Sequence, residues 1–431
     1  MKKTILSLLV FLTIQITNAQ DNVAALFNDA QIIFEKELNT IPVEVFPFEG
    51  HTFITGAADG IHEDVLLILD KSGNQIAEKP LENTIYFPVT ASRNGEFINL
   101  PTIISHPDEC YYCIEFFAYT YDKKGNLISE IKTTTYHTEL SPNGDYLITT
   151  KVEDVEQGGW FEAFDVKTGE KISLPAIGKY SHFHAAFIND TKVALVTHHF
   201  EIKFDTTQHR RSRKYRTSIE LGDSLTILDL KSKTVDLKAK LKYSGTDFFS
   251  TQFDNKALWI SPDGSKILIV GASKPQEEKS AREKYALIAL SSKGELLWNK
   301  SFEQEENDFE GVEDMVFLDN NTAAVLKFGL IQSELKLINL EDGKENWNYQ
   351  LGPKFSAQIK GFSVSKTDAA FAIDFSSSWE EYKLTMRFNR EKPELLNTLE
   401  GKTILSKSMK YSAVKEGENS IKLVRNERNT N

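Results

Sequence analysis

The sequence is poor in cysteine, proline, glycine and long hydrophobic runs. Its 431 residues include only two Cys, 12 Pro and 23 Gly, which excludes a fibrous chain and disfavours a disordered one. Beyond the first twenty residues, no segment approaches the roughly 20 apolar residues of a membrane-spanning helix. Basic residues are also in deficit, because 50 Lys and Arg face 62 Asp and Glu, a net charge of −12. We therefore expect a folded protein that does not span a membrane and does not bind nucleic acid.

Signatures of catalysis are also missing. No Gly-x-Ser-x-Gly, Walker loop or His-Glu-x-x-His occurs, and Ile114 follows Cys113, which excludes haem attachment at Cys110-x-x-Cys113. The sequence assigns no metal and no cofactor. An enzyme is therefore the less favoured interpretation.

The first nineteen residues have the composition of a secretion signal. Lys2 and Lys3 precede the mostly apolar run 5–16, and Thr17-Asn18-Ala19 supplies the small residues of a cleavage site before Gln20. We predict cleavage after Ala19 and a secreted or periplasmic protein. We expect a monomer.

A repeated turn flanked by strand-like segments organises the remainder. Aligned on a central glycine, five clear copies and two degenerate ones occur: 70–78, 122–130, 166–174, 292–300 and 341–349, with 230–237 and 388–396. A second hairpin signal, rich in Asn, Asp and Gly, precedes each copy: 48–53, 92–97, 141–146, 188–193, 261–266, 318–323 and 365–370. Such residues supply the positive φ angles of tight hairpins. Four antiparallel strands every 45 to 60 residues are typical of a β-propeller.

The sequence thus predicts an all-β fold: a single β-propeller over 41–431 with seven four-stranded blades, eight being possible. Before it, residues 20–40 form a predicted helix and linker, because apolar positions between Asp21 and Leu38 follow the spacing of one helix face. The segment 415–420 joins two more strand-like pieces. The C-terminus therefore either pairs with the first blade or adds an eighth; we favour seven blades with closure.

The repeats resemble known propeller families. The segments 261–270 (SPDGSKILIV) and 141–150 (SPNGDYLITT) are similar to TolB-type and tryptophan-aspartate repeats. Gly294 to Trp298 and Gly343 to Trp347 resemble the Gly-x-x-x-Trp of pyrroloquinoline-quinone propellers. The resemblance implies turn formation and docking between blades. It implies no activity.

The predicted topology separates two edges of every blade. Both sets of short turns lie at one edge, which we call the short-turn edge. The opposite edge, the long-loop edge, carries the second-to-third loops and the connections between blades, where propellers usually recognise ligands.

Two clusters fall near the long-loop edge. A hairpin turn at Asn189 and Asp190 brings His182 and His184 close to His198 or His199, as metal ligands or an acid–base pair, although a shift of one residue in register decides which. A basic stretch in the longest second-to-third loop contains Arg210, Arg211 and Arg213, which suit an anionic group. Structural roles remain open for both clusters.

Four other residues complete the predicted set. Trp160 and Trp379 lie at the ends of second-to-third loops, where they could stack on a sugar or peptide. Cys110 and Cys113 form a predicted local disulfide, with free thiols or redox chemistry as the alternatives. An acidic stretch over 303–314 lacks the spacing of a calcium loop.

Two functional hypotheses follow. The leading one is an exported binding module that recognises a protein, peptide or glycan through its long-loop face. The alternative is a hydrolase or lyase that uses the histidine cluster. Convergence of the histidines would favour the enzyme.

Overall fold

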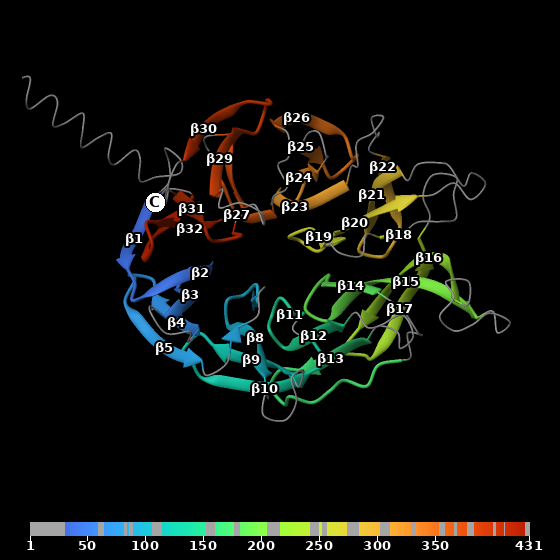
Figure 1. Cartoon of the computed structure of the whole chain (residues 1–431), viewed down its shortest axis with the longest axis horizontal. Helices are drawn as coiled ribbons and strands as arrows, with labels where there is room; N and C mark the ends of the chain where they lie inside the picture. Colours follow the sequence, from blue (N-terminus) through green and yellow to red (C-terminus); the bar gives the residue numbers. More distant parts are fainter. Residues whose placement is uncertain are drawn as a thin grey trace, which may run out of the picture. The chain divides into compact units, whose positions relative to one another are not determined.

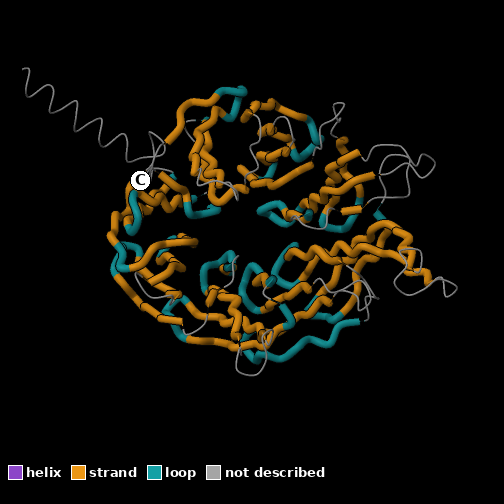
Figure 2. The backbone as a smooth tube through the Cα atoms, in the orientation of Figure 1, coloured by secondary structure: helices purple, strands orange, loops and turns teal. Residues whose placement is uncertain are grey.

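A computed structural model describes most of residues 31–426. The residues outside the description are 1–30, 59–63, 82–83, 86–88, 106–113, 136, 152–159, 176–181, 205–215, 242–249, 252–256, 274–283, 302–310, 329–332, 353–357, 366–368, 377–382, 400–401, 409 and 427–431. Within the described part the chain is all-β, with strands and connecting loops and no helix (Figure 2). Eight antiparallel sheets form the blades of a β-propeller fold.

The strands divide between two compact units, Met1–Lys79 with Ala357–Asn431, and Pro80–Ser356. The first unit contains three blades (Figure 1). One comprises β2 (Thr40–Pro47), β3 (His51–Ala58), β4 (Asp64–Asp70) and β5 (Gln75–Leu81). Another comprises β27 (Gln358–Val364), β28 (Ala370–Ser376), β29 (Lys383–Asn389) and β30 (Leu395–Leu399). The third combines β31 (Lys402–Ile404), β32 (Tyr411–Glu416), β33 (Ser420–Arg425) and β1 (Gln31–Glu37).

The second unit contains five blades, each a sheet of consecutive strands. The first of these blades consists of β6 (Thr84–Ile85), β7 (Thr90–Ala91), β8 (Phe97–Ser105), β9 (Ile114–Asp122) and β10 (Leu127–Thr133). The second consists of β11 (Thr138–Leu140), β12 (Tyr146–Lys151) and β13 (Trp160–Asp165). The third consists of β14 (His182–Phe187), β15 (Lys192–Phe204), β16 (Arg216–Asp229) and β17 (Thr234–Lys240). The fourth consists of β18 (Ser250–Thr251), β19 (Leu258–Ile260), β20 (Lys266–Ser273), β21 (Lys284–Ser291) and β22 (Leu296–Ser301). The fifth consists of β23 (Gly311–Asp319), β24 (Thr322–Phe328), β25 (Ser333–Asn339) and β26 (Glu345–Gly352).

Thirteen of the fourteen predicted hairpin turns join two strands as expected. The exception is the turn at 166–174, which follows β13 and leads only to an isolated bridge between Phe164 and Lys171. The other turns of the first set join third to fourth strands and the second set joins first to second strands, so both lie at the short-turn edge of their blades. Three of the turns share a Ser-x-Asx-Gly arrangement in which the Ser hydroxyl donates to the Asx side chain, as from Ser261 Oγ to Asp263 Oδ1 (2.7 Å). The same Asx oxygen accepts from a backbone amide two residues later, so the turn conformation is locally determined.

Two details of the prediction are wrong. Residues Gln31–Glu37 form strand β1 and not the second half of a helix; the first half lies outside the described residues. The blades number eight and not the favoured seven, because the C-terminal strands form a sheet of their own. Strand β1 pairs with β33 in that sheet, so the chain both adds a blade and joins its two terminal regions.

The cores lie between neighbouring blades. One apolar cluster joins the sheet β14–β17 to the sheet with β19–β22, through residues such as Val196, Leu225 and Ile269. The next joins that second sheet to β23–β26 and includes Trp259 and Trp298. Trp347 is also buried. The predicted role of Trp298 in docking between blades is therefore confirmed.

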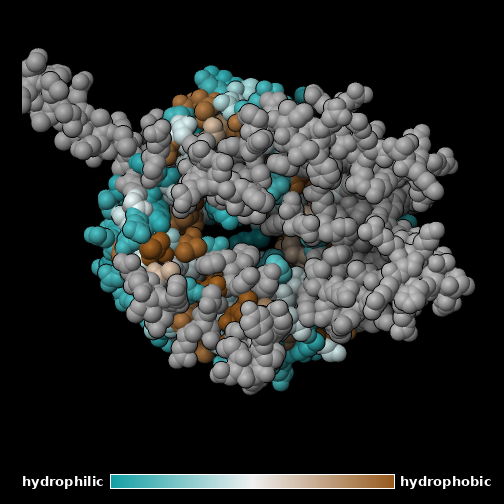
Figure 3. Space-filling model, in the orientation of Figure 1, coloured by the Kyte–Doolittle hydropathy of each residue, from teal (hydrophilic) through white to brown (hydrophobic). Residues whose placement is uncertain are grey.

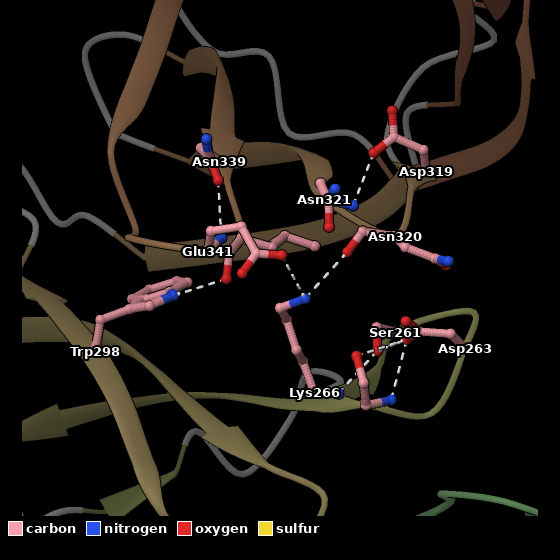
Figure 4. Close-up of polar contacts among 11 residues, drawn as sticks. Ser261, Asp263, Lys266, Trp298, Asp319, Asn320, Asn321, Asn339 and Glu341 are labelled. Carbon is pink, nitrogen blue, oxygen red and sulfur yellow. Dashed lines mark hydrogen bonds and ion pairs between the residues drawn. The ribbon is translucent and has the colours of Figure 1, made fainter.

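Turn glycines bring these neighbouring blades close together. The indole of Trp298 donates from Nε1 to Leu340 O (2.9 Å), and its ring lies so near Gly343 that a Cβ there would come within 2.6 Å of the ring. Beside it, Lys266 Nζ spans from its own blade to Glu341 Oε1 (3.1 Å) and Asn320 O (3.5 Å) (Figure 4). Packing and polar contacts thus join the two blades at the short-turn edge.

Gly264 provides a test of this close approach. Its φ is +72° and an added Cβ would overlap the Ile188 carbonyl oxygen of the preceding blade, whereas Gly169, with a φ of +69°, has only Ile131 Cγ1 at 4.0 Å. We expect Gly169→Ala to cost only the left-handed backbone term of about 1–2 kcal/mol. Gly264→Ala should cost about 1–3 kcal/mol more, because the blades must separate. Equal losses in the free energy of unfolding, measured with denaturant, would contradict this view of blade docking.

Candidate functional site

The short-turn edge is occupied by structural contacts. In the Pro80–Ser356 unit, Arg93 Nη1 donates to Pro262 O (2.7 Å), and Asn94 Nδ2 donates to Asn143 O (3.1 Å). These bonds join the first turns of three different blades. Backbone and side-chain groups at this edge therefore hold blades together, and a ligand site is expected at the long-loop edge instead.

The long-loop edge of the blade β14–β17 has an unusual extension. Strands β15 and β16 contain 13 and 14 residues, and their pairing continues from Lys192 opposite Asp229 to Phe204 opposite Arg216. Their neighbours are shorter: β14 pairs only as far as His198 and β17 only as far as Ser224. Among the residues that the structure describes, the segments 200–204 and 216–220 therefore pair only with each other. We call this two-stranded projection the arm.

A β-bulge separates the arm from the blade. His199 lies opposite Gly222 and Phe200 lies opposite Glu220, which leaves Leu221 as the extra residue. Gly222 has a φ of +86°. A bulge bends its strand and increases the local twist, so the arm begins at a defined bend.

The histidines are brought together by strand register. His182 lies directly opposite His198, and His198 lies opposite Asp223 on the next strand. His184 follows two residues after His182, so these four residues lie on one face of the sheet. His199 lies on the other face. The predicted convergence of three of the four histidines is therefore consistent with the pairing, whereas their function stays a prediction.

Asp223 was missed by the sequence analysis. It is fully buried on the same face as Leu225 and Ile227, which pack into the core between blades. A buried carboxylate needs hydrogen-bond donors or a cation around it. The signal in the sequence is an acidic residue that continues the apolar alternation of a strand, in GDSLTIL at 222–228.

The remaining predicted residues are less informative. Trp160 begins β13 opposite Lys151, directly after the second-to-third loop, as expected. The others lie outside the described residues: Arg210, Arg211, Arg213, Trp379, Cys110 and Cys113. The three arginines belong to the segment 205–215, which joins the two strands of the arm.

On the described surface, no other feature is as distinct as the arm and the row of histidines. Nine large apolar residues are exposed, and on the face shown in Figure 3 small hydrophobic groups are separated by hydrophilic residues. Among the side chains that the structure describes, no group of three or more His, Cys, Asp or Glu could hold a metal ion. In the same part of the chain, no helix is long and apolar enough to cross a membrane.

His137 adds a titratable group to the long-loop edge. It lies between β10 and β11, where its amide donates to Thr135 Oγ1 (3.2 Å) and its carbonyl accepts from Thr150 N (3.2 Å). Although part of the side chain is exposed, burial of the imidazole lowers the pKa of His137 below its ordinary value.

This shift predicts a pH-dependent stability difference. Because the unfolded chain binds the His137 proton near its ordinary pKa of about 6.5 and the folded chain binds it only at lower pH, stability is lost as the pH falls below that value. We expect His137→Gln to lose less stability than the wild type between pH 7.5 and 5.5, with parallel behaviour above pH 7.5. Parallel denaturation free energies across the acid range would show that His137 is not desolvated.

Comparisons with known proteins identify the fold and no closer relationship. No family model matches the sequence, and no curated protein matches it. Among solved structures, the chain is similar to BamB from Moraxella catarrhalis, with a TM-score of 0.53 and 8% identity over 92% of this chain and 99% of that chain. It is also similar to the Dos1 propeller, with a TM-score of 0.53 and 11% identity over 92% and 95% of the two chains. The resemblance to β-propeller repeat proteins is confirmed at the level of the fold, which by itself carries no function.

Proposed function

We propose that this protein is an exported binding module that recognises an anionic protein, peptide or glycan through the arm of β15 and β16. The observation that supports this function most directly is the extension of these two strands beyond β14 and β17. A two-stranded ribbon is at best marginally stable alone. The extension is therefore better explained by recognition than by stability of the blade.

The charge of the arm's tip indicates the chemistry of the partner. The segment 209–216 contains four arginines and one lysine, whereas the whole chain carries a net charge of −12. A local positive group on an acidic protein attracts an anionic partner while the remaining surface repels nonspecific ones. Arginine also binds carboxylate, sulfate or phosphate groups in a bidentate manner.

Replacing Arg210, Arg211 and Arg213 with Ala tests this proposal. We expect the wild type to be retained on immobilised heparin or poly-glutamate and to elute with salt, since screened charges hold it. The triple variant should elute at lower salt, with an unfolding free energy changed by less than about 0.5 kcal/mol. A matched control removes three exposed lysines of the short-turn edge: Lys71, Lys231 and Lys293.

The control separates the arm from net charge. If the lysine variant loses as much retention as the arginine variant, binding follows overall charge and the arm is not the recognition element. A second variant that replaces 201–219 with an Asn-Gly turn should remain folded and should also lose retention. Full retention by this shortened protein would overturn the proposal.

A hydrolase or lyase is the second candidate function. It is supported by the register that places His182, His198 and Asp223 in one row, because such groups can serve acid–base or metal-assisted chemistry. Loss of a hydrolytic or eliminating activity in His198→Ala, with heparin retention unchanged, would favour it.

Export makes a separate prediction. Protein recovered from the periplasm or culture medium should begin at Gln20, and its intact mass should lack two hydrogens because Cys110 and Cys113 are bonded. Reduction should restore the two mass units. A retained 1–19 segment would contradict export, and a fully reduced mass would contradict the disulfide.

A further inference from the structure

The outer strand of the blade β14–β17 has one open edge. Among the strands that the structure describes, β17 pairs only with β16 (Figure 1). Leu241 N donates to Asp223 O (2.8 Å), which fixes the alternation of the antiparallel ladder, so that residues 237, 239 and 241 direct their backbone groups to β16. The backbone N–H and C=O groups of Lys238 and Lys240 therefore point away from the sheet, toward the open edge.

A β-bulge confines this open edge to the part of β17 that is nearest the long-loop edge. The pairing shifts between Ile227 and Leu228, which leaves Asp236 as the extra residue of β17. A bulge twists an edge strand away from a partner, and Asp236 is already paired with Lys192 Nζ (2.5 Å). Beyond the bulge, residues 237–240 stay in register with β16. These four residues are the part of the edge to which a further strand can pair.

Two lysines give this edge its charge. Lys238 and Lys240 are exposed and, being two residues apart, lie on the same face of the strand at a separation of about 7 Å. Neither lysine has an ion-pair partner among the residues that the structure describes. On the outer strand of the next blade, by contrast, Lys300 of β22 pairs with Glu345 (3.2 Å). The edge of β17 therefore exposes positive charge that the described part of the fold does not neutralise.

The opposite face of the same edge is apolar. Leu237 and Ala239 are half-buried, and Leu237 packs against the core cluster between this blade and the next. A strand that pairs with β17 presents alternate side chains to the two faces. On one face its carboxylates lie beside the lysines, and on the other its apolar side chains extend the row of Leu237 and Ala239. The edge therefore fits an extended peptide in which acidic and apolar residues alternate.

We propose that the edge of β17 over residues 237–240 binds such a peptide as an added strand, which pairs with the backbone of Lys238 and Lys240 and places carboxylates beside their ammonium groups. Edge lysines oppose pairing with basic or uncharged strands, so the same side chains that attract this partner exclude others. The edge is a second binding surface of the blade and does not depend on the role of the arm.

The probe is a short fluorescent peptide in which Glu and Val alternate, and its binding to the full-length protein is measured by fluorescence anisotropy at low salt. We expect saturable binding of one peptide per chain. Lys238→Ala with Lys240→Ala should weaken it about 10-fold. Lys238→Glu with Lys240→Glu should abolish it and produce binding of the corresponding Lys–Val peptide. The matched control, Lys231→Ala with Lys233→Ala, removes the same charge from the exposed turn before β17 and should change the affinity less than about 2-fold.

Backbone pairing is tested separately from charge. Lys240→Pro removes an outward N–H, which edge strands tolerate, whereas Lys240→Ala keeps it, so the proline variant should bind the peptide more weakly. A peptide of the same composition with contiguous glutamates should bind at least about 10-fold more weakly than the alternating one. Equal affinity for the two peptides, or no saturable binding by the wild type, would show that the lysines only keep the edge unpaired and would overturn the site.

Two further measurements keep the result interpretable. Thermal unfolding identifies a variant that fails to fold, and N-methylation of alternate peptide amides then replaces the proline variant, since it blocks pairing without changing the protein. The protein whose arm is shortened by replacing 201–219 should bind the alternating peptide like the wild type. Loss of binding in that protein would place the peptide on the arm and contradict a site on β17.

Discussion

Within each of the two units, the structure depends on the close docking of a blade's turns against the blade before it. In the Pro80–Ser356 unit, Trp298 of β22 packs on Gly343 and Leu237 of β17 packs on Gly294. In the other unit, Phe34 of β1 packs on Gly73 in the same manner. A bulky residue on an outer strand thus meets a turn that lacks a side chain. Because the interior between blades is as dense as a crystal, this contact fixes both the residue type and the turn conformation.

This constraint explains why the two edges of a blade differ. At the short-turn edge, each turn must satisfy its own backbone and also present a smooth surface to its neighbour, so little sequence freedom remains. The long-loop edge has no such requirement. The blade β14–β17 uses that freedom, since β15 and β16 extend beyond their neighbours without changing the pairing of the blade itself. Because the blades are held together at the short-turn edge, strands and loops can be longer at the long-loop edge.

The sequence predicted those features that are determined locally. Positive φ angles at Gly264 and Gly294 and Asx hydrogen bonds leave a direct signature in the sequence, and thirteen of the fourteen predicted turns join strands as expected. The favoured number of seven blades was wrong because the turn at Gly417 joins the second and third strands of its sheet. This turn therefore does not continue the pattern of turns between third and fourth strands from which the blades were counted. The predicted helix is wrong over 31–37 because pairing of β1 with β33, with a bulge at Ile33, makes successive apolar residues compatible with a strand. No local feature of this segment indicates that it pairs with β33, almost 400 residues later in the chain.

The histidine row shows the same limit at the level of the site. The hairpin at Asn189 and Asp190 predicted that His182 would approach His198, but only the register shows that His199 lies on the other face and that Asp223 joins the row. The arm then continues from His199 to Phe204, five residues or about 17 Å of strand. The row continues the paired strands of the blade core, whereas in the described part of the chain the segments of the arm pair only with each other beyond the bulge. Substitutions in one should therefore leave the geometry of the other unchanged.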